Sequence, residues 1–161
     1  MMTDREAAEM HTQLEEWQLQ RFGTSNQNFW AAMSEHMFTQ FMTERTEDHH
    51  ECLGGNTEGY DVRNTVSGTT FEIKHTRTTA NNYVFGGLKD KSADYAVFIK
   101  WEYDHPMRPE YCIKMDMSLV KENLNENCNR FYSKRMKDIL ANEELSFDDY
   151  TDEFREWVEC R

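Results

Sequence analysis

The sequence predicts a mixed α/β domain in which helices flank a small central mixed β-sheet. Apolar residues recur at helical spacing near both ends of the chain. Between them, residues 60–76 alternate around a glycine-containing turn, as a β-hairpin does, and Tyr95–Trp101 is a nearly unbroken apolar run, which is typical of a buried strand. The 161 residues fit a single domain, with its core at about 25–115 and extra C-terminal helices at about 117–159.

Two helices are predicted before the sheet, over residues 4–20 and from about residue 25 to Thr43. In each, apolar side chains recur every three or four residues, so one side of the helix is expected to face the core. Residues 44–58 are polar and are expected to form a loop. The predicted inward side chains are Met10, Leu14 and Trp17 in the first helix and Trp30, Met33, Met37, Phe38 and Phe41 in the second.

Further elements are predicted from apolar runs and from turn residues. Residues 77–93 contain Gly86-Gly87 and are expected to be irregular or to include a short helix. Both prolines lie in a turn at 105–109, after which Tyr111–Met115 returns as a strand. The C-terminal part is expected to form helices over about 117–124, 126–141 and 147–159, with Ser146 as the N-cap of the last.

The hairpin is the segment most informative about function. With Ser67-Gly68 at the centre of its turn, Asp61 is predicted to lie opposite Lys74, and Arg63 opposite Glu72. Side chains alternate between the two faces of a strand, so all four charged residues share one face. The other face carries apolar residues that belong against a helix. These are Val62, Phe71 and Ile73.

Two carboxylates and a lysine on one strand face suit metal-assisted cleavage of a phosphodiester. Cross-strand neighbours lie about 5 Å apart at Cβ, so Asp61 and Glu72 are close enough to share one Mg²⁺ ion. A bound metal ion lowers the pKa of a water molecule, and Lys74 can orient that nucleophile. The alternative is an ordinary solvent-facing strand pair, held by salt bridges between Asp61 and Lys74 and between Arg63 and Glu72.

The residues Gly59-Tyr60-Asp61, followed after ten residues by Glu72-Ile73-Lys74, resemble the motif of the PD-(D/E)XK nuclease superfamily. The resemblance covers about half of the chain. It implies a restriction-endonuclease-like core, built in the order helix, three strands, helix and strand. Tyr60 stands where the motif usually has a proline.

What the resemblance implies is a metal-dependent endonuclease that hydrolyses DNA phosphodiester bonds with Mg²⁺ or Mn²⁺. Asp61 and Glu72 would bind the metal ion together with the carbonyl oxygen of Ile73, and Lys74 would assist the attacking water. The family often has a further acid on the first core helix, for which Glu35 is the candidate. Enzymes of restriction, recombination and repair share this core.

Contacts to nucleic acid are expected near the hairpin. The candidates are Arg63 and Thr76 on the face of Lys74, Arg77 directly after the strand, and Lys89 and Lys91 in the segment that follows. That segment is either a loop near DNA or an ordinary surface loop. A second basic run, from Arg130 to Lys137, either contacts phosphate or forms a solvated helix face.

The net charge of −12 argues against nucleic-acid binding by the surface as a whole. Residues 61–100 nevertheless carry six basic and four acidic side chains, so the hairpin lies in a net-positive block. The alternative function, favoured by the overall charge, is a non-catalytic acidic protein of nuclease fold that acts as a DNA mimic, an inhibitor or a protein-binding module.

Composition also sets expectations about location and partners. No run approaches about 18 apolar residues, so no membrane span is expected, and the acidic N-terminus is unlike a secretory signal, which favours the cytoplasm. The four cysteines include no CxxC pair and are expected to be free thiols. No organic cofactor is expected. A protomer with one metal site would cut two DNA strands most simply as a homodimer.

Overall fold

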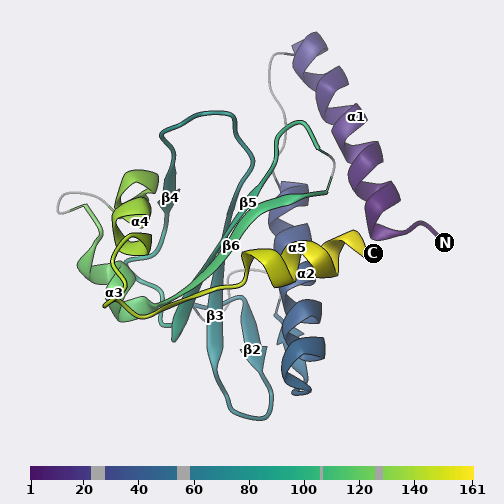
Figure 1. The fold of residues 1–161 in the computed structure, drawn as a ribbon. Coiled ribbons are helices and arrows are strands. Elements are labelled where there is room, and N and C mark those ends of the chain that lie inside the picture. The colour runs from purple at the N-terminus through teal and green to yellow at the C-terminus, as the bar shows by residue number, and fades with distance from the viewer. Residues whose placement is uncertain (23–27, 54–58, 106, 126–128) are drawn as a thin grey trace.

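A six-stranded mixed sheet and a two-stranded ribbon form the centre of the computed structural model, and helices flank them (Figure 1), which confirms the predicted mixed α/β class. The structure describes residues 1–22, 28–53, 59–105, 107–125 and 129–161. The helices are α1 (Asp4–Phe22), α2 (Asn28–Thr46), α3 (Met117–Glu122), α4 (Ser133–Leu140) and α5 (Thr151–Glu159). The strands are β1 (His50–Cys52), β2 (Val62–Asn64), β3 (Thr70–Thr76), β4 (Val84–Gly86), β5 (Tyr95–Trp101), β6 (Pro109–Asp116), β7 (Arg130–Tyr132) and β8 (Phe147–Asp149).

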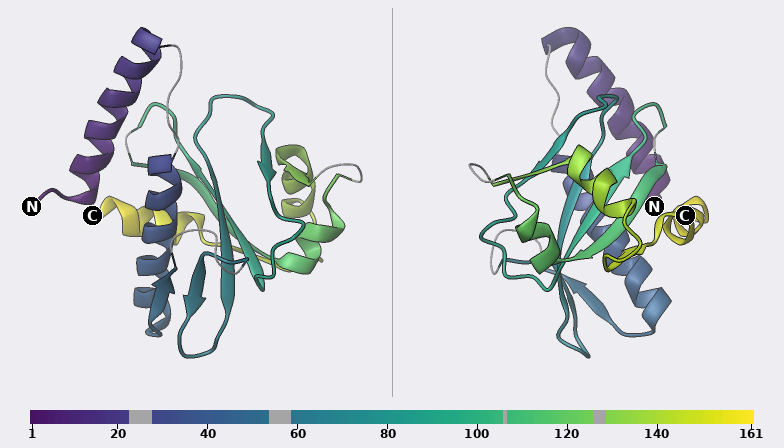
Figure 2. Two further views of the ribbon diagram at one scale, coloured as in Figure 1. Left: turned by 180° about the vertical axis from the view of Figure 1, so that it is seen from behind. Right: turned by 60° about the vertical axis from the view of Figure 1, so that its left-hand side comes forward.

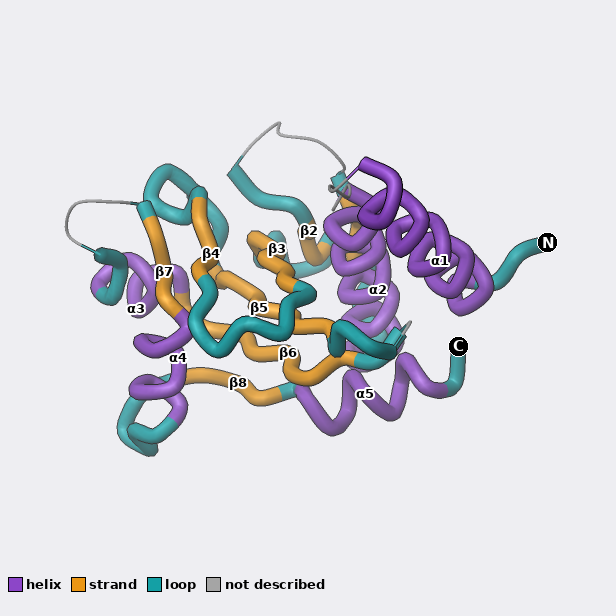
Figure 3. The backbone as a smooth tube through the Cα atoms, turned by 90° about the horizontal axis from the view of Figure 1, so that it is seen from above, coloured by secondary structure: helices purple, strands orange, loops and turns teal. Residues whose placement is uncertain are grey.

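The strands of the large sheet lie in the order β1-β2-β3-β5-β6-β8. Neighbours are antiparallel except β3 and β5, which are parallel, with Phe71 beside Tyr95 and Thr76 beside Lys100. The chain crosses from β3 to β5 through β4, which pairs with β7 in the separate ribbon. Viewed from above, this ribbon lies on the opposite side of β3 from α2 (Figure 3).

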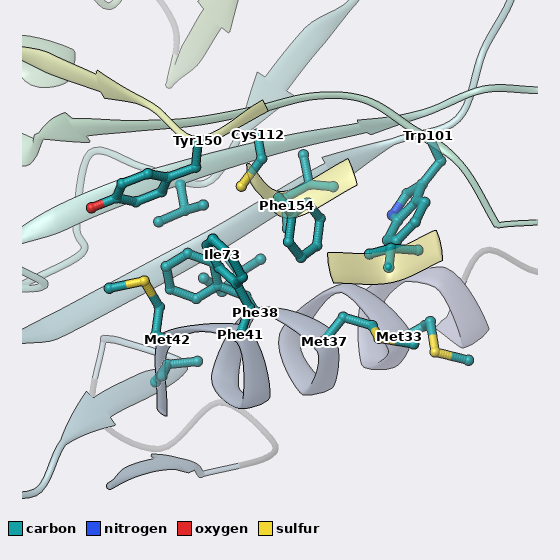
Figure 4. Packing of buried hydrophobic residues seen from close by; sticks show 14 of the residues in the cluster. Met33, Met37, Phe38, Phe41, Met42, Ile73, Trp101, Cys112, Tyr150 and Phe154 are labelled. Atoms are coloured by element: carbon teal, nitrogen blue, oxygen red, sulfur yellow. The ribbon is translucent and has the colours of Figure 1, made fainter. Parts of the chain in front are cut away.

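Both faces of the sheet are covered, as the apolar run of β5 requires. One cluster lies between the sheet and helices α2 and α5, and Figure 4 shows Met37, Phe38 and Phe41 of α2 in this layer with Ile73 and Phe154. A second cluster lies between the other face and a layer formed by the ribbon, α3 and α4. Figure 2 shows these elements on the side of the sheet away from α2. Residues of β5 alternate between the two clusters: Val97, Ile99 and Trp101 belong to the first, and Ala96 and Phe98 to the second.

Helix α1 packs through a side that its apolar spacing does not predict. The side chains expected to face the core are exposed: Met10 by 57%, Leu14 by 50% and Trp17 by 51%. Ala8 and Glu15 are buried instead, and His11 stacks on Phe29 with 4.2 Å between ring centroids. The helix lies beside the domain rather than under the sheet (Figure 1), so polar contacts decide which side faces inward.

Four three-residue strands lie where the sequence pattern predicts loop or helix. β1 lies in the predicted loop 44–58, and β4 lies in the segment 77–93. β7 and β8 occupy parts of the predicted helices 126–141 and 147–159, so α4 and α5 are shorter than expected. Three residues are too few to display the two-residue period by which a strand is recognised.

The ends of several elements also differ from the predicted ones. The N-cap of α5 is Tyr150 rather than Ser146. β6 begins earlier than predicted, at Pro109, where a proline is tolerated because it is the first residue of a strand. The expected start of the second helix, at about residue 25, lies outside the described residues, as does Cys128. Cys52, Cys112 and Cys160 are not joined in disulfide bonds. No helix in the described residues combines the length and apolar character that crossing a membrane requires.

Candidate active site

The turn of the β2–β3 hairpin is centred one residue earlier than predicted. The N–H of Asn64 donates to the carbonyl of Thr69, and Val62 pairs with Phe71. Asn64 itself fixes this turn, because its Oδ1 accepts the N–H groups of the next turn residues, Val66 and Ser67, at 2.8 and 3.1 Å. The pairing of the two strands is therefore displaced by two residues from the predicted register.

A displacement of two residues leaves every side chain on its predicted face. The predicted division into a charged face and an apolar face is therefore confirmed, whereas the predicted opposite pairs are wrong. Arg63 lies opposite Thr70 rather than Glu72. Asp61 lies just beyond the paired residues of β2, but its N–H donates to the carbonyl of Phe71 at 2.8 Å, which keeps it next to β3.

A cavity of about 310 Å³ lies between α2, β3 and β4, and we call it the active-site cavity. The residues predicted to be catalytic all line it: Glu35 from α2, Asp61 just before β2, and Glu72 and Lys74 from β3. Lys91, from the loop after β4, lines it as well. Side chains that are distant in the sequence thus meet at one place.

Asp61 lies where β2 and β3 separate. Its Oδ2 accepts the backbone N–H of Ile73 at 2.8 Å. If β2 extended further, a backbone carbonyl of β2 would accept this N–H instead. The N–H and the C=O of one strand residue point to the same edge of the strand. The carbonyl oxygen of Ile73 therefore points to the edge on which Asp61 lies, which brings two of the predicted metal-binding groups together.

Glu72 carries the most buried carboxylate of the cavity, with 2% of the residue exposed. Its Oε1 lies 3.1 Å from Lys74 Nζ and 3.4 Å from Lys91 Nζ. Its Oε2 is buried and has no hydrogen-bond partner among the described groups. Burial raises the pKa of Glu72, and the charge of Asp61 raises it further, while the two lysines oppose the rise. An unsatisfied carboxylate oxygen beside a second carboxylate favours a bound cation.

Glu35 reaches the same cavity from α2. Burial, followed by the charge of Asp61, raises the pKa of Glu35 to about 7, so its carboxyl group is partly protonated near neutral pH. The thiol of Cys52 on β1 donates to Glu35 Oε2 at 3.8 Å between sulfur and oxygen. Sequence reasoning missed Cys52 because its position depends on β1, for which the sequence shows no period.

Glu35→Gln should stabilise the metal-free protein at pH 8 and have little effect at pH 4. The pKa of Glu35 is about 7 in the folded state, above its ordinary value of 4.5, so the folded protein binds the proton more tightly than the unfolded chain. Wild-type stability therefore falls as pH rises from about 4.5 to 7, a loss that glutamine avoids. Thermal unfolding across this range measures the difference in Tm, and a difference independent of pH would contradict the assignment.

The predicted nucleic-acid contacts do not all lie at the site. Lys91 does, through its ion pair with Glu72. Arg63 shares the charged face but forms its ion pair with Glu51 on β1, outside the cavity. Thr76 lies at the end of β3 and Lys89 is exposed on the loop before Lys91, and neither lines the cavity.

Arg77 was predicted to contact nucleic acid, but the structure places it in contacts within the chain. The residue is 8% exposed, and its Nη1 lies 2.6 Å from the Glu15 carboxylate of α1. Its Nη2 donates to the carbonyl of Tyr103 at 2.8 Å, and the guanidinium lies over the Trp30 ring. The end of β3 lies beside α1, so Arg77 fastens that helix to the sheet and is not available to a phosphate.

The residues of the active-site cavity fit a magnesium ion held partly by substrate. No three His, Cys, Asp or Glu side chains in the described ranges are arranged to hold a metal ion by themselves. Mg²⁺ does not require such a cage, because it binds one or two carboxylates and completes its octahedron with carbonyl, water and substrate oxygens. Asp61, Glu72 Oε2 and the Ile73 carbonyl are suitable oxygen ligands for such a partial shell.

Comparison with known proteins adds no family assignment. No protein-family model matches the chain, and no curated protein matches it either. The functional interpretation therefore rests on the chemistry of the active-site cavity.

Proposed function

We propose that the chain is a metal-dependent nuclease with a restriction-endonuclease-like core, which hydrolyses DNA phosphodiester bonds with Mg²⁺ or Mn²⁺. The observation that carries this proposal is the buried Glu72 carboxylate, whose Oε1 contacts two lysines while Oε2 has no hydrogen-bond partner among the described groups. A carboxylate with only a structural role would have both oxygens satisfied. The open oxygen, with the Asp61 carboxylate in the same cavity, suits a cation instead.

The proposal assigns chemical roles to five residues that line the cavity. Asp61, Glu72 and the Ile73 carbonyl would hold the metal ion, which would supply a water molecule of lowered pKa and offset charge on the phosphoryl group. Lys74 positions the attacking water and stabilises the negative charge that develops on the phosphoryl oxygens. Glu35, with a pKa of about 7, is placed to accept a proton from that water.

We propose further that the nuclease acts as a homodimer. The described residues of one chain form a cavity of this composition at one place, and hydrolysis of both strands of a duplex needs two attacks at opposed phosphates. A two-fold dimer supplies two identical sites related in the same way as the two DNA strands.

Wild-type protein should cleave supercoiled and linear plasmid DNA in Mg²⁺ or Mn²⁺ and should lose this activity in EDTA, because removal of the metal removes the activated water. Agarose gels follow the products. Fractions from size-exclusion chromatography should show cleavage that coincides with the protein peak, which excludes a contaminating nuclease and reports the mass of the active species. No cleavage of any DNA in either metal would contradict the proposal.

Two observations favour the non-catalytic alternative. Two lysines already neutralise Oε1 of Glu72, and the whole chain carries a net charge of −12, as an acidic DNA mimic or inhibitor would. That alternative expects no metal-dependent cleavage and no effect of metal ions on thermal unfolding. The plasmid assay therefore separates the two functions.

A further inference from the structure

The two-stranded ribbon, formed by β4 and β7, presents an outward face beside the active-site cavity. Its strands are antiparallel, with Val84 beside Tyr132 and Gly86 beside Arg130. The central residue of each strand is buried, and the residues on either side of it are exposed. Because side chains alternate along a strand, these four flanking residues share the outward face.

This outward face connects two cavities. Val84 and Gly86 line the active-site cavity. Tyr132, the cross-strand neighbour of Val84, lines a second cavity of about 400 Å³ at the start of α4, together with Lys134 and Arg135. Figure 3 shows β4, β7 and α4 as neighbours. Cross-strand neighbours lie about 5 Å apart, so an extended chain can cross from one cavity to the other along the surface.

The ribbon and α4 carry a cluster of cations that lack carboxylate partners. Most other cations in the described residues are ion-paired, as Arg45 is with Glu153 at 2.8 Å, although Arg5, Lys89 and Lys121 are not. In the described part of the chain, no carboxylate lies within 4.0 Å of the members of this cluster, which are exposed. They are Arg130, Lys134, Arg135 and Lys137. With 30 acidic and 18 basic residues in the chain, unpaired cations gathered on one surface favour an anionic ligand.

We propose that this surface is a track for the sugar–phosphate backbone of a DNA strand that continues from the active-site cavity. Phosphates contact Arg130 on the ribbon and Lys134 and Arg135 at the second cavity, and the Tyr132 ring packs against a sugar between them. Asp138 also lines the second cavity, where the two cations outweigh its charge. The inference rests on the proposed nuclease function and extends it to the path of the substrate.

The track has a rigid support. The Phe98 ring of the sheet lies 4.8 Å from that of Phe85 in β4 and 5.0 Å from that of Phe131 in β7, measured between centroids. The Oδ1 of Asn129 accepts the N–H of Leu88 at 2.9 Å, which ties the loop after β4 to β7. A surface already held in position loses little conformational freedom when a ligand binds.

The test is DNA binding by Lys134→Ala/Arg135→Ala, measured by fluorescence anisotropy with a labelled duplex in EDTA, where cleavage cannot occur. The matched control is Arg45→Ala/Arg161→Ala, which removes the same charge from the α2–α5 side of the sheet. The track variant should bind about tenfold more weakly. The magnitude of its negative slope of log K against log salt should decrease by about 1.8, the value for two phosphate contacts. The control should remain within about twofold of wild type.

The outcomes separate this inference from the nuclease proposal. Equal affinity and equal salt slope in wild type and the track variant would overturn the track, even if plasmid DNA is still cut. Equal weakening by the control pair would also overturn it, because net charge alone would then explain binding. Weaker binding by the track variant alone, with no cleavage by wild type, would support the track and contradict the nuclease. A wild-type protein that binds no DNA at low salt would overturn both.

Discussion

Lys74→Ala should lower kcat for Mg²⁺-dependent DNA cleavage by about 10²–10³-fold, with a smaller change in KM. Lys74 Nζ lies 3.1 Å from Glu72 Oε1 in a partly buried cavity, where a positive charge interacts more strongly than in water. Its charge is needed when negative charge develops on the phosphoryl oxygens, so its loss acts mainly on the transition state. Asp61→Asn should lower kcat to a similar extent, because the amide keeps the shape of the side chain but is no longer an anionic metal ligand. Steady-state kinetics on supercoiled plasmid measures both variants.

Two other lysines make this experiment specific. Lys91→Ala should chiefly raise KM, since in the proposed function Lys91, on the loop after β4, binds a substrate phosphate rather than the attacking water. Lys114→Ala is the matched control, because Lys114 is also an ion-paired strand lysine of low exposure (16%, against 22% for Lys74) but lies two strands away, on β6. Equal losses in Lys74→Ala and Lys114→Ala would contradict the role assigned to Lys74.

Arg77→Ala should lower the free energy of unfolding by about 3–5 kcal/mol, because it leaves the Glu15 carboxylate buried without its cation. The side chains of both residues are nearly inaccessible to water, at 3% and 5%, and the Arg77 guanidinium also lies over the rings of Trp30 and Tyr103. The variant should lose the packing of α1 first. Urea unfolding followed by circular dichroism measures the change.

Matched variants show whether the unpaired buried charge of Glu15 causes the loss of stability in Arg77→Ala. Arg77→Met combined with Glu15→Leu replaces both charges by apolar groups and should recover part of the loss. Val66→Ala, at a position 72% exposed in the hairpin turn, should change stability by less than about 0.5 kcal/mol. A loss of less than about 1 kcal/mol in Arg77→Ala would show that Arg77 does not fasten α1, and would reopen its assignment to nucleic acid.

The charged face of the hairpin could be predicted because it depends on local sequence. Charged and apolar residues alternate in both strands, and only one assignment of faces buries Val62 and Ile73. The opposite pairs could not be predicted, because Ser67-Gly68 suggests one turn centre while the side chain of Asn64 stabilises another. The side chains of the site stay on the predicted face because the two registers differ by an even number of residues.

Contacts between distant segments could not be predicted from local patterns. Lys91 reaches Glu72 only because the chain crosses through β4 on its way to β5. Cys52 reaches Glu35 through β1, a strand too short to recognise. Arg77 directly follows the charged strand and resembled a site residue, yet the position of α1 determines its partner. In each case tertiary packing decides the role of a residue whose neighbours in sequence suggest another.

The most direct test of the metal site is a crystal structure of wild-type protein grown with MnCl₂, analysed by anomalous diffraction at the manganese edge. The proposal predicts a peak in the active-site cavity, about 2 Å from a carboxylate oxygen of Asp61, Glu72 Oε2 and the carbonyl oxygen of Ile73. A cavity without a peak, in which Glu72 contacts only Lys74 and Lys91, would contradict the metal-dependent nuclease.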